Sequence, residues 1–202
     1  MLSDKTHELA PFRETMHHVI ELGDDYWVHD FTRGYDVDFI CPYPNSIGRY
    51  DEIRPGMYTQ ALFEGKRDLH MGIDIGAPIG EKIYAFSNCV VHSMGINAED
   101  GSYGPTIITK HDFEGKDLWA LHGHLSLESL DQVEVGQNIK EGDVIAFVGS
   151  MEVNGGWEPH LHLQLSWNEP EGNDMPGVVE RIDRESAMKI YPDPRIVLGP
   201  IY

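Results

Sequence analysis

The chain of 202 residues has only two cysteines, few basic residues and no long apolar run. Cys41 and Cys89 are too few for a disulfide framework and stand in no metal-binding motif, so we expect two reduced thiols. Fifteen lysines and arginines oppose 34 aspartates and glutamates, which gives a formal net charge of −19. Such a surface repels phosphate groups. It therefore argues against nucleic acid and anionic membranes as partners.

Hydrophobic segments of membrane or signal type are also missing. No stretch approaches the roughly 20 apolar residues of a membrane-spanning helix, and residues 1–12 lack the apolar centre of a secretion signal. The sequence as it stands therefore predicts a cytoplasmic protein. Export by a route that the sequence does not reveal is the alternative.

Turn-forming residues are abundant, with 21 glycines and 12 prolines. Residues 12–22 carry apolar side chains at helical spacing and predict one short amphipathic helix, which Gly23 ends. Residues 24–68 are aromatic and rich in turns, and we expect an irregular segment wrapped on the main domain. The C-terminal tail, residues 168–202, should pack on that domain and hold a short helix near Arg184–Lys189.

Short strand signals fill the region between these segments and predict a mainly β fold. Strands this short and frequent are typical of an antiparallel sheet sandwich or a partly open barrel. The expected organisation is a helix and wrapping segment at 1–68, a β-domain at 69–167 and a tail at 168–202. The candidate strands are 73–75, 82–86, 88–94, 106–110, 118–122, 144–148 and 160–167.

Eleven histidines are present, and five of them fall in three short motifs within this β-region. The motifs are His70-Met-Gly-Ile-Asp74, His122-Gly-His124 and Pro159-His160-Leu-His162. Residues two apart on a strand share a face. His160 and His162 should therefore point to one side, an exposed polar face, while Leu161, Leu163 and Leu165 point into the core.

These residue types suit a catalytic zinc site, which takes three protein ligands and leaves one position open for water. His70, Asp74 and one histidine of the last pair supply such a set. The remaining histidines of the two His-x-His pairs could orient water, transfer protons or stabilise an oxyanion. A glutamate base of the His-Glu-x-x-His type is absent from the sequence.

Four segments in this order resemble the lysostaphin-type zinc endopeptidases, a family that cleaves peptidoglycan. The resemblance covers residues 69–167 and implies that His70, Asp74 and His162 bind zinc while His124 and His160 are catalytic. His122 stands where the family often has tyrosine, and we interpret it as lining the groove. Residues 103–108, 124–127, 154–160 and 192–195 look more like a subgroup fused to kinase-like and aminotransferase-like domains. The four segments are His70–Pro78, Gly123–Leu125, Val133–Gly149 and Pro159–Leu163.

The resulting expectation is a zinc metalloendopeptidase that hydrolyses a peptide or amide bond in peptidoglycan or a related peptide. One alternative is a non-catalytic, metal-stabilised binding module on the same fold, and another is a zinc amidohydrolase with a non-wall substrate. Mononuclear iron oxygenases also use two histidines and a carboxylate, but they need no pair of extra histidines. The glycine pattern around Gly136 and Gly142 resembles biotin- or lipoyl-like carriers, but the acceptor lysine of such a carrier is missing. The sequence leaves the oligomeric state open.

Overall fold

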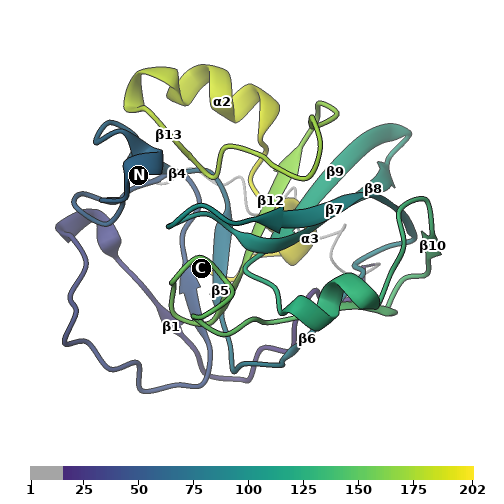
Figure 1. The fold of residues 1–202 in the computed structure, drawn as a ribbon, viewed down its shortest axis with the longest axis horizontal. Coiled ribbons are helices and arrows are strands. Elements are labelled where there is room, and N and C mark those ends of the chain that lie inside the picture. The colour runs from purple at the N-terminus through teal and green to yellow at the C-terminus, as the bar shows by residue number, and fades with distance from the viewer. Residues whose placement is uncertain (1–15) are drawn as a thin grey trace.

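The computed structural model describes residues 16–202, and its centre is an eight-stranded sheet (Figure 1). The strands follow the order β1-β2-β5-β12-β9-β8-β7-β10. All neighbours run antiparallel except β1 and β2, which are parallel. The bounds are β1 Trp27–Val28, β2 Ser46–Gly48, β5 Ile73–Gly76, β7 Cys89–Asn97, β8 Gly104–Phe113, β9 Lys116–Gly123, β10 Asn138–Ile139 and β12 His160–Ser166.

Two smaller sheets and a few short helices complete the described part of the chain. One sheet pairs β6 (Lys82–Tyr84) with β11 (Val144–Phe147), and the other has the order β13-β4-β3. Its strands are β3 Glu52–Ile53, β4 Leu69–His70 and β13 Val178–Val179. The helices are α2 Arg184–Ile190 and α3 Arg195–Leu198, with 3₁₀ turns at Phe31–Arg33, Ala61–Phe63, Leu127–Asp131 and Arg181–Asp183.

This arrangement confirms the mainly β, antiparallel fold, and the sheets of residues 16–202 do not close into a barrel. The helix predicted near Arg184–Lys189 is confirmed as α2. None of the helices in residues 16–202 combines the length and apolarity that a membrane crossing needs.

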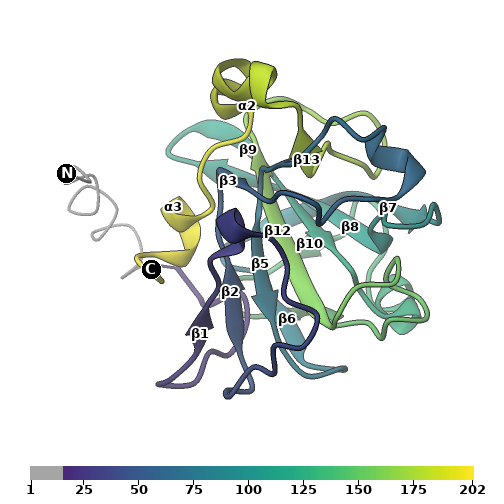
Figure 2. The same ribbon diagram turned by 90° about the vertical axis from the view of Figure 1, so that its left-hand side faces the viewer.

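Strand β12 lies near the middle of the large sheet, between β5 and β9 (Figure 2). Its leucines Leu161, Leu163 and Leu165 are fully buried, as their alternation with polar residues predicts. They share one hydrophobic core with residues of β6 and β11, such as Ile83 and Ile145. Burying each such side chain contributes about 1.5–3 kcal/mol. The core thereby fixes which way the polar side chains of β12 point.

The predicted N-terminal helix is wrong where the structure describes it. Residues 16–22 are not helical, and residues 12–15 of that prediction lie outside the described part. The segment follows the edge near β6: the amide of Tyr84 donates to the carbonyl of Val19, and the amide of His17 donates to that of Phe86. Val19 and Ile20 are buried in the core. Tertiary hydrogen bonds and burial have therefore overridden the local helical pattern.

The wrapping segment is largely irregular, as expected, but it also adds strands to the eight-stranded sheet and to the three-stranded sheet. β2 extends the large sheet by pairing with β5, which places Gly48 opposite Asp74. β3 pairs with β4, which places Glu52 opposite His70. With three and two residues, β2 and β3 carry too little periodicity to be predicted from this turn-rich segment. Their consequence is that the segment before residue 68 lies directly beside the first histidine motif.

Candidate metal centre

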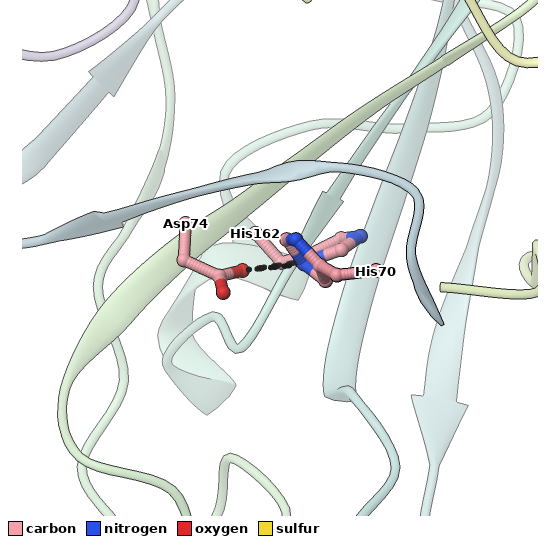
Figure 3. Close-up of side chains that lie close together, drawn as sticks. All are labelled: His70, Asp74 and His162. Atoms are coloured by element: carbon pink, nitrogen blue, oxygen red, sulfur yellow. Dashed lines mark hydrogen bonds and ion pairs between the residues drawn. The ribbon is translucent and has the colours of Figure 1, made fainter. Parts of the chain in front are cut away.

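The backbone brings three potential metal ligands together from distant positions. Asp74 is in β5, and the antiparallel register places His162 of β12 directly opposite it. His70 is the last residue of β4, before the short turn that leads into β5. Figure 3 shows the three side chains converging on one point. They form the only group of three or more potential ligands within metal-binding reach in residues 16–202.

The spacing of the donor atoms fits a tetrahedral zinc ion. Oδ1 of Asp74 lies 2.9 Å from Nδ1 of His162 and 3.2 Å from Nε2 of His70. The two ring nitrogens are 3.1 Å apart. Two ligands bound to zinc at 2.0–2.1 Å and at the tetrahedral angle would be about 3.3 Å apart. A nitrogen, nitrogen and oxygen set at this spacing suits zinc with one position left open.

Hydrogen bonds on the far side of each ring select the nitrogen that faces the site. Nδ1 of His70 lies 2.9 Å from the carbonyl of Arg49, so this nitrogen must donate and Nε2 keeps its lone pair. His162 is held the other way round, because its Nε2 lies 3.2 Å from Oε1 of Gln164. The amide of Gln164 donates to the carbonyl of Pro176, which orients Oε1 as the acceptor. Such partners are typical of metal-binding histidines.

His124 and His160 lie beside the three ligands without belonging to the set. His124 follows β9 in the left-handed backbone conformation, at φ 62°, and donates from Nδ1 to the carbonyl of Asn154 at 2.7 Å. His160 donates from Nδ1 to the carbonyl of Glu158 at 2.6 Å. The two ring centroids are 4.3 Å apart, and Nε2 of His160 is 3.6 Å from Oδ1 of Asp74. Both rings therefore present an unprotonated Nε2.

The electrostatics favour this set of protonation states. Burial lowers the pKa of His70 to about 4, helped by the positive charge of Arg54. Burial also holds the pKa of His124 well below its usual value, helped by His160 and His162, and lowers that of His160. Burial opposes ionisation of Asp74, but His70 and Arg54 hold its pKa well below the usual range. At neutral pH the site therefore offers the carboxylate of Asp74 and neutral imidazoles at His70, His124 and His160.

A cleft of about 1210 Å³ opens above these five residues. The wrapping segment supplies much of its wall, including Trp27, Phe31, Tyr35 and Phe39. Trp157 also lines the cleft, and its indole nitrogen donates to the carbonyl of Gly101. The volume of the cleft exceeds the roughly 300–1,000 Å³ of pockets that hold a small molecule.

A family model for peptidases covers this region. The model described as peptidase family M23 matches residues 68–174, which includes all five site residues. The chain belongs to peptidase family M23. Membership places it among the metallopeptidases and confirms the lysostaphin-type resemblance found in the sequence. Residues 1–67 and 175–202 lie outside the match.

Several solved structures of peptidases are similar to the chain. The catalytic domain of lysostaphin from Staphylococcus simulans has 22% identity and a TM-score of 0.46, covering 67% of this chain and 88% of that one. A mutant catalytic domain of the prophage-encoded EnpA from Enterococcus faecalis has 27% identity and a TM-score of 0.47, covering 70% and 91%. A zinc-containing peptidase from Vibrio cholerae has 24% identity and a TM-score of 0.44, covering 58% and 32%. No curated protein matches the chain.

Two expectations about polar residues of this M23 domain are wrong. His122 does not line the groove: it is fully buried, lies opposite Leu163 in the β9–β12 pair and so faces the leucine core. The polar face of β12 is also not open to solvent, because Gln164 and Ser166 are buried. Residues 175–177 of the tail cover it, with the amide of Gln164 bonded to Pro176. Sequence alternation fixes the face of a side chain but not what covers that face.

Several residues that lie around the ligands could not be assigned a role at the site from the sequence. Tyr103 lies within 3.5 Å of Nε2 of His162 and donates to the carbonyl of Met175. Asn154 is fully buried and supplies the carbonyl that orients His124. Arg54 donates to the second oxygen of Asp74. Gln164 lies two residues from His162 on the same face of β12, and Tyr103 and Asn154 begin two of the segments that resemble the fused subgroup, but neither signal indicates a role at the ligands. Tyr103, Asn154 and Arg54 reach the site through tertiary contacts.

Proposed function

We propose that the chain is a zinc-dependent peptidase in which His70, Asp74 and His162 hold the metal and His124 and His160 carry protons. One observation supports this best: three donor atoms at tetrahedral spacing lie next to two neutral imidazoles in an open cleft. The donor set, two nitrogens and one carboxylate oxygen, is of the type found in catalytic zinc sites.

Zinc at this position would supply a Lewis acid that lowers the pKa of a water molecule and polarises an amide carbonyl. The remaining work falls to the two histidines. Their Nδ1 atoms donate to backbone carbonyls, so each Nε2 can accept a proton but has none to give at first. His160, whose Nε2 lies 3.6 Å from Oδ1 of Asp74, is the proposed acceptor for the proton of the attacking water. Once protonated, a ring can donate to the leaving nitrogen or to the oxyanion.

The proposed substrate is a peptide, with peptidoglycan cross-links or related peptides as the first class to test. The aromatic walls of the cleft suit contact with an extended chain rather than with a small ion. The net charge of −19 disfavours close binding to a densely anionic polymer. This favours short peptides or cross-link segments over a polymer that carries many phosphates.

Two alternatives from the sequence remain to be separated by experiment. A non-catalytic binding module would need the metal but not His124 and His160, and all five positions are filled here. A zinc amidohydrolase with a non-wall substrate would use the same five residues on another amide. Activity on a defined panel of substrates distinguishes these possibilities.

The test is digestion of purified muropeptides and of short glycine- or D-amino-acid peptides, followed by mass spectrometry. The zinc-loaded protein should yield products whose masses together equal the substrate plus one water. The metal-free protein and the zinc-loaded His160→Ala variant serve as matched controls and should release far less product. Cleavage confined to amides that are not wall peptides would favour the amidohydrolase. Failure to cleave any member of the panel would favour the binding module.

A further inference from the structure

Arg54 is a buried guanidinium group behind the metal centre, with 2% of its surface exposed. It follows β3 in the wrapping segment and lies outside the residues that the family model matches. Its Nη1 donates to Oδ2 of Asp74 at 2.6 Å, and its Nε donates to Oε2 of Glu52 at 3.0 Å. The guanidinium therefore bridges a proposed ligand and a second buried carboxylate.

The contact divides the two oxygens of Asp74 between different partners. Oδ2 is occupied by Arg54, while Oδ1 faces the nitrogens of His70 and His162 at 3.2 and 2.9 Å. A carboxylate fixed in this way offers a metal one oxygen only. Without the arginine it could rotate or bind through both oxygens, which would fill the position that water needs.

The same short segment also orients His70. Nη2 of Arg54 donates to the carbonyl of Arg49 at 3.3 Å, and that carbonyl accepts the Nδ1 proton of His70 at 2.9 Å. Glu52 in turn is bonded through Oε1 to the side chain of Arg49. Residues 49–54 thus contact two of the three ligands through one connected network.

The net charge of this network is small close to the ligands. The positive charges of Arg54 and Arg49 face the carboxylate of Glu52, which is 3% exposed, and Arg54 also faces Asp74. Glu52 thus reduces the repulsion between Arg54 and a bound divalent cation. The forked geometry of the guanidinium fixes the position of Asp74. Lysine would keep the charge but could not reach Asp74, Glu52 and the carbonyl of Arg49 together.

We propose that Arg54 is a positioning residue of the metal centre, which holds Asp74 as a one-oxygen ligand and, through the carbonyl of Arg49, supports the orientation of His70. This inference rests on the proposed zinc site. It makes the wrapping segment, outside the matched peptidase region, a determinant of metal affinity and coordination.

The experiment measures zinc affinity by chelator competition and the visible spectrum of the cobalt-substituted protein, together with melting of the metal-free form. Arg54→Lys keeps the positive charge but removes the forked guanidinium that contacts Glu52, Asp74 and the carbonyl of Arg49. The double variant Arg54→Met with Glu52→Gln removes both members of the buried ion pair, so that neither charge is left in the interior without its partner. Arg195→Lys is the matched control, because Arg195 makes a two-pronged contact with Asp193 away from the site.

Both Arg54 variants should bind zinc roughly 10–100-fold more weakly than wild type, the usual range for a partner behind a metal ligand. Their cobalt spectra should change in intensity, because a freed carboxylate alters the coordination number. Arg195→Lys should match wild type in both measurements. Wild-type affinity and spectrum in folded Arg54 variants would overturn the inference, as would failure of both variants to fold with zinc present, which would make Arg54 purely structural. If wild type itself bound no zinc, the proposed function would fail as well.

Discussion

At the scale of single residues, backbone carbonyls determine what each histidine of the site can do. His70, His124 and His160 all donate from Nδ1 to a main-chain oxygen, so each turns Nε2 toward the cleft. His162 is bonded at Nε2 and turns Nδ1 to the metal position. The ligand and proton-transfer roles that the sequence motifs suggest are thus compatible with one tautomer for each ring.

Removing His124 or His160 should separate catalysis from metal binding. His124→Ala and His160→Ala should keep zinc, because neither ring belongs to the group of three ligands. Turnover should fall by about 10²–10⁴-fold, the usual contribution of a general acid–base group. The measurement is zinc content, melting temperature and kcat for each variant, with the exposed His18→Ala as control. Full activity in both variants would contradict the proposed division of roles.

At the scale of elements, the close approach of the β4–β5 turn to β12 shapes the site. Gly72 lies in this turn, and an added Cβ would stand 2.5 Å from Cε1 of His162 and 2.8 Å from the carbonyl of Leu163. The glycine of the first motif is therefore needed for space. Any larger side chain must displace the ligand ring or the backbone of β12.

Gly72→Ala should weaken zinc binding and lower the melting temperature of the metal-free protein. The methyl group would push the His162 ring away from Asp74, which disturbs the 2.9 Å spacing of their donor atoms. Gly23→Ala is the control, since its nearest neighbour would be 3.8 Å away. Chelator competition and thermal melting measure both effects. Unchanged zinc affinity in Gly72→Ala would show that the turn can shift without disturbing the positions of the zinc ligands.

The longer strands could be predicted from the sequence, whereas the shortest ones could not. The strand β12 and the faces of its leucines follow from simple alternation, and the seven predicted strands correspond to β5, β6, β7, β8, β9, β11 and β12. The two-residue strands β3, β4 and β13 have no such pattern, because their pairing depends on residues far away in the sequence. Arg54 was missed for the same reason: its role comes from the pairing of β3 with β4 beside the site.

At the scale of the whole molecule, the core contains two histidines that face away from the metal site. His111 is 2% exposed, and its ring nitrogens contact the hydroxyls of Ser87 and Thr109. His122 is fully buried, and its Nε2 has no hydrogen-bond partner among the described residues. Burial, with the nearby His122, lowers the pKa of His111 to about 3, and burial lowers that of His122 to about 4.

These two histidines should make the fold sensitive to acid. In the unfolded chain both histidines titrate near pH 6.5. In the folded protein His122 takes up a proton only near pH 4 and His111 only near pH 3. The free energy of unfolding should therefore be highest above pH 6.5 and fall as the pH decreases toward 4. The loss between pH 7 and 5 is about 1–2 kcal/mol for each histidine.

Denaturant unfolding of the metal-free protein between pH 7 and 5 tests this directly. His122→Asn cannot take up a proton, so its unfolding free energy should decrease less steeply with falling pH than that of wild type. Parallel slopes for wild type and His122→Asn would mean that His122 does not oppose folding in acid.

The central claim for the whole molecule is that one zinc ion is held by three residues from β4, β5 and β12. Metal analysis of the purified chain, beside His70→Ala and Asp74→Ala, tests it most directly. We predict one zinc per wild-type chain, with X-ray absorption distances of about 2.0–2.2 Å to nitrogen and oxygen ligands, and loss of the metal from both variants. Full zinc retention in both His70→Ala and Asp74→Ala would contradict the assignment.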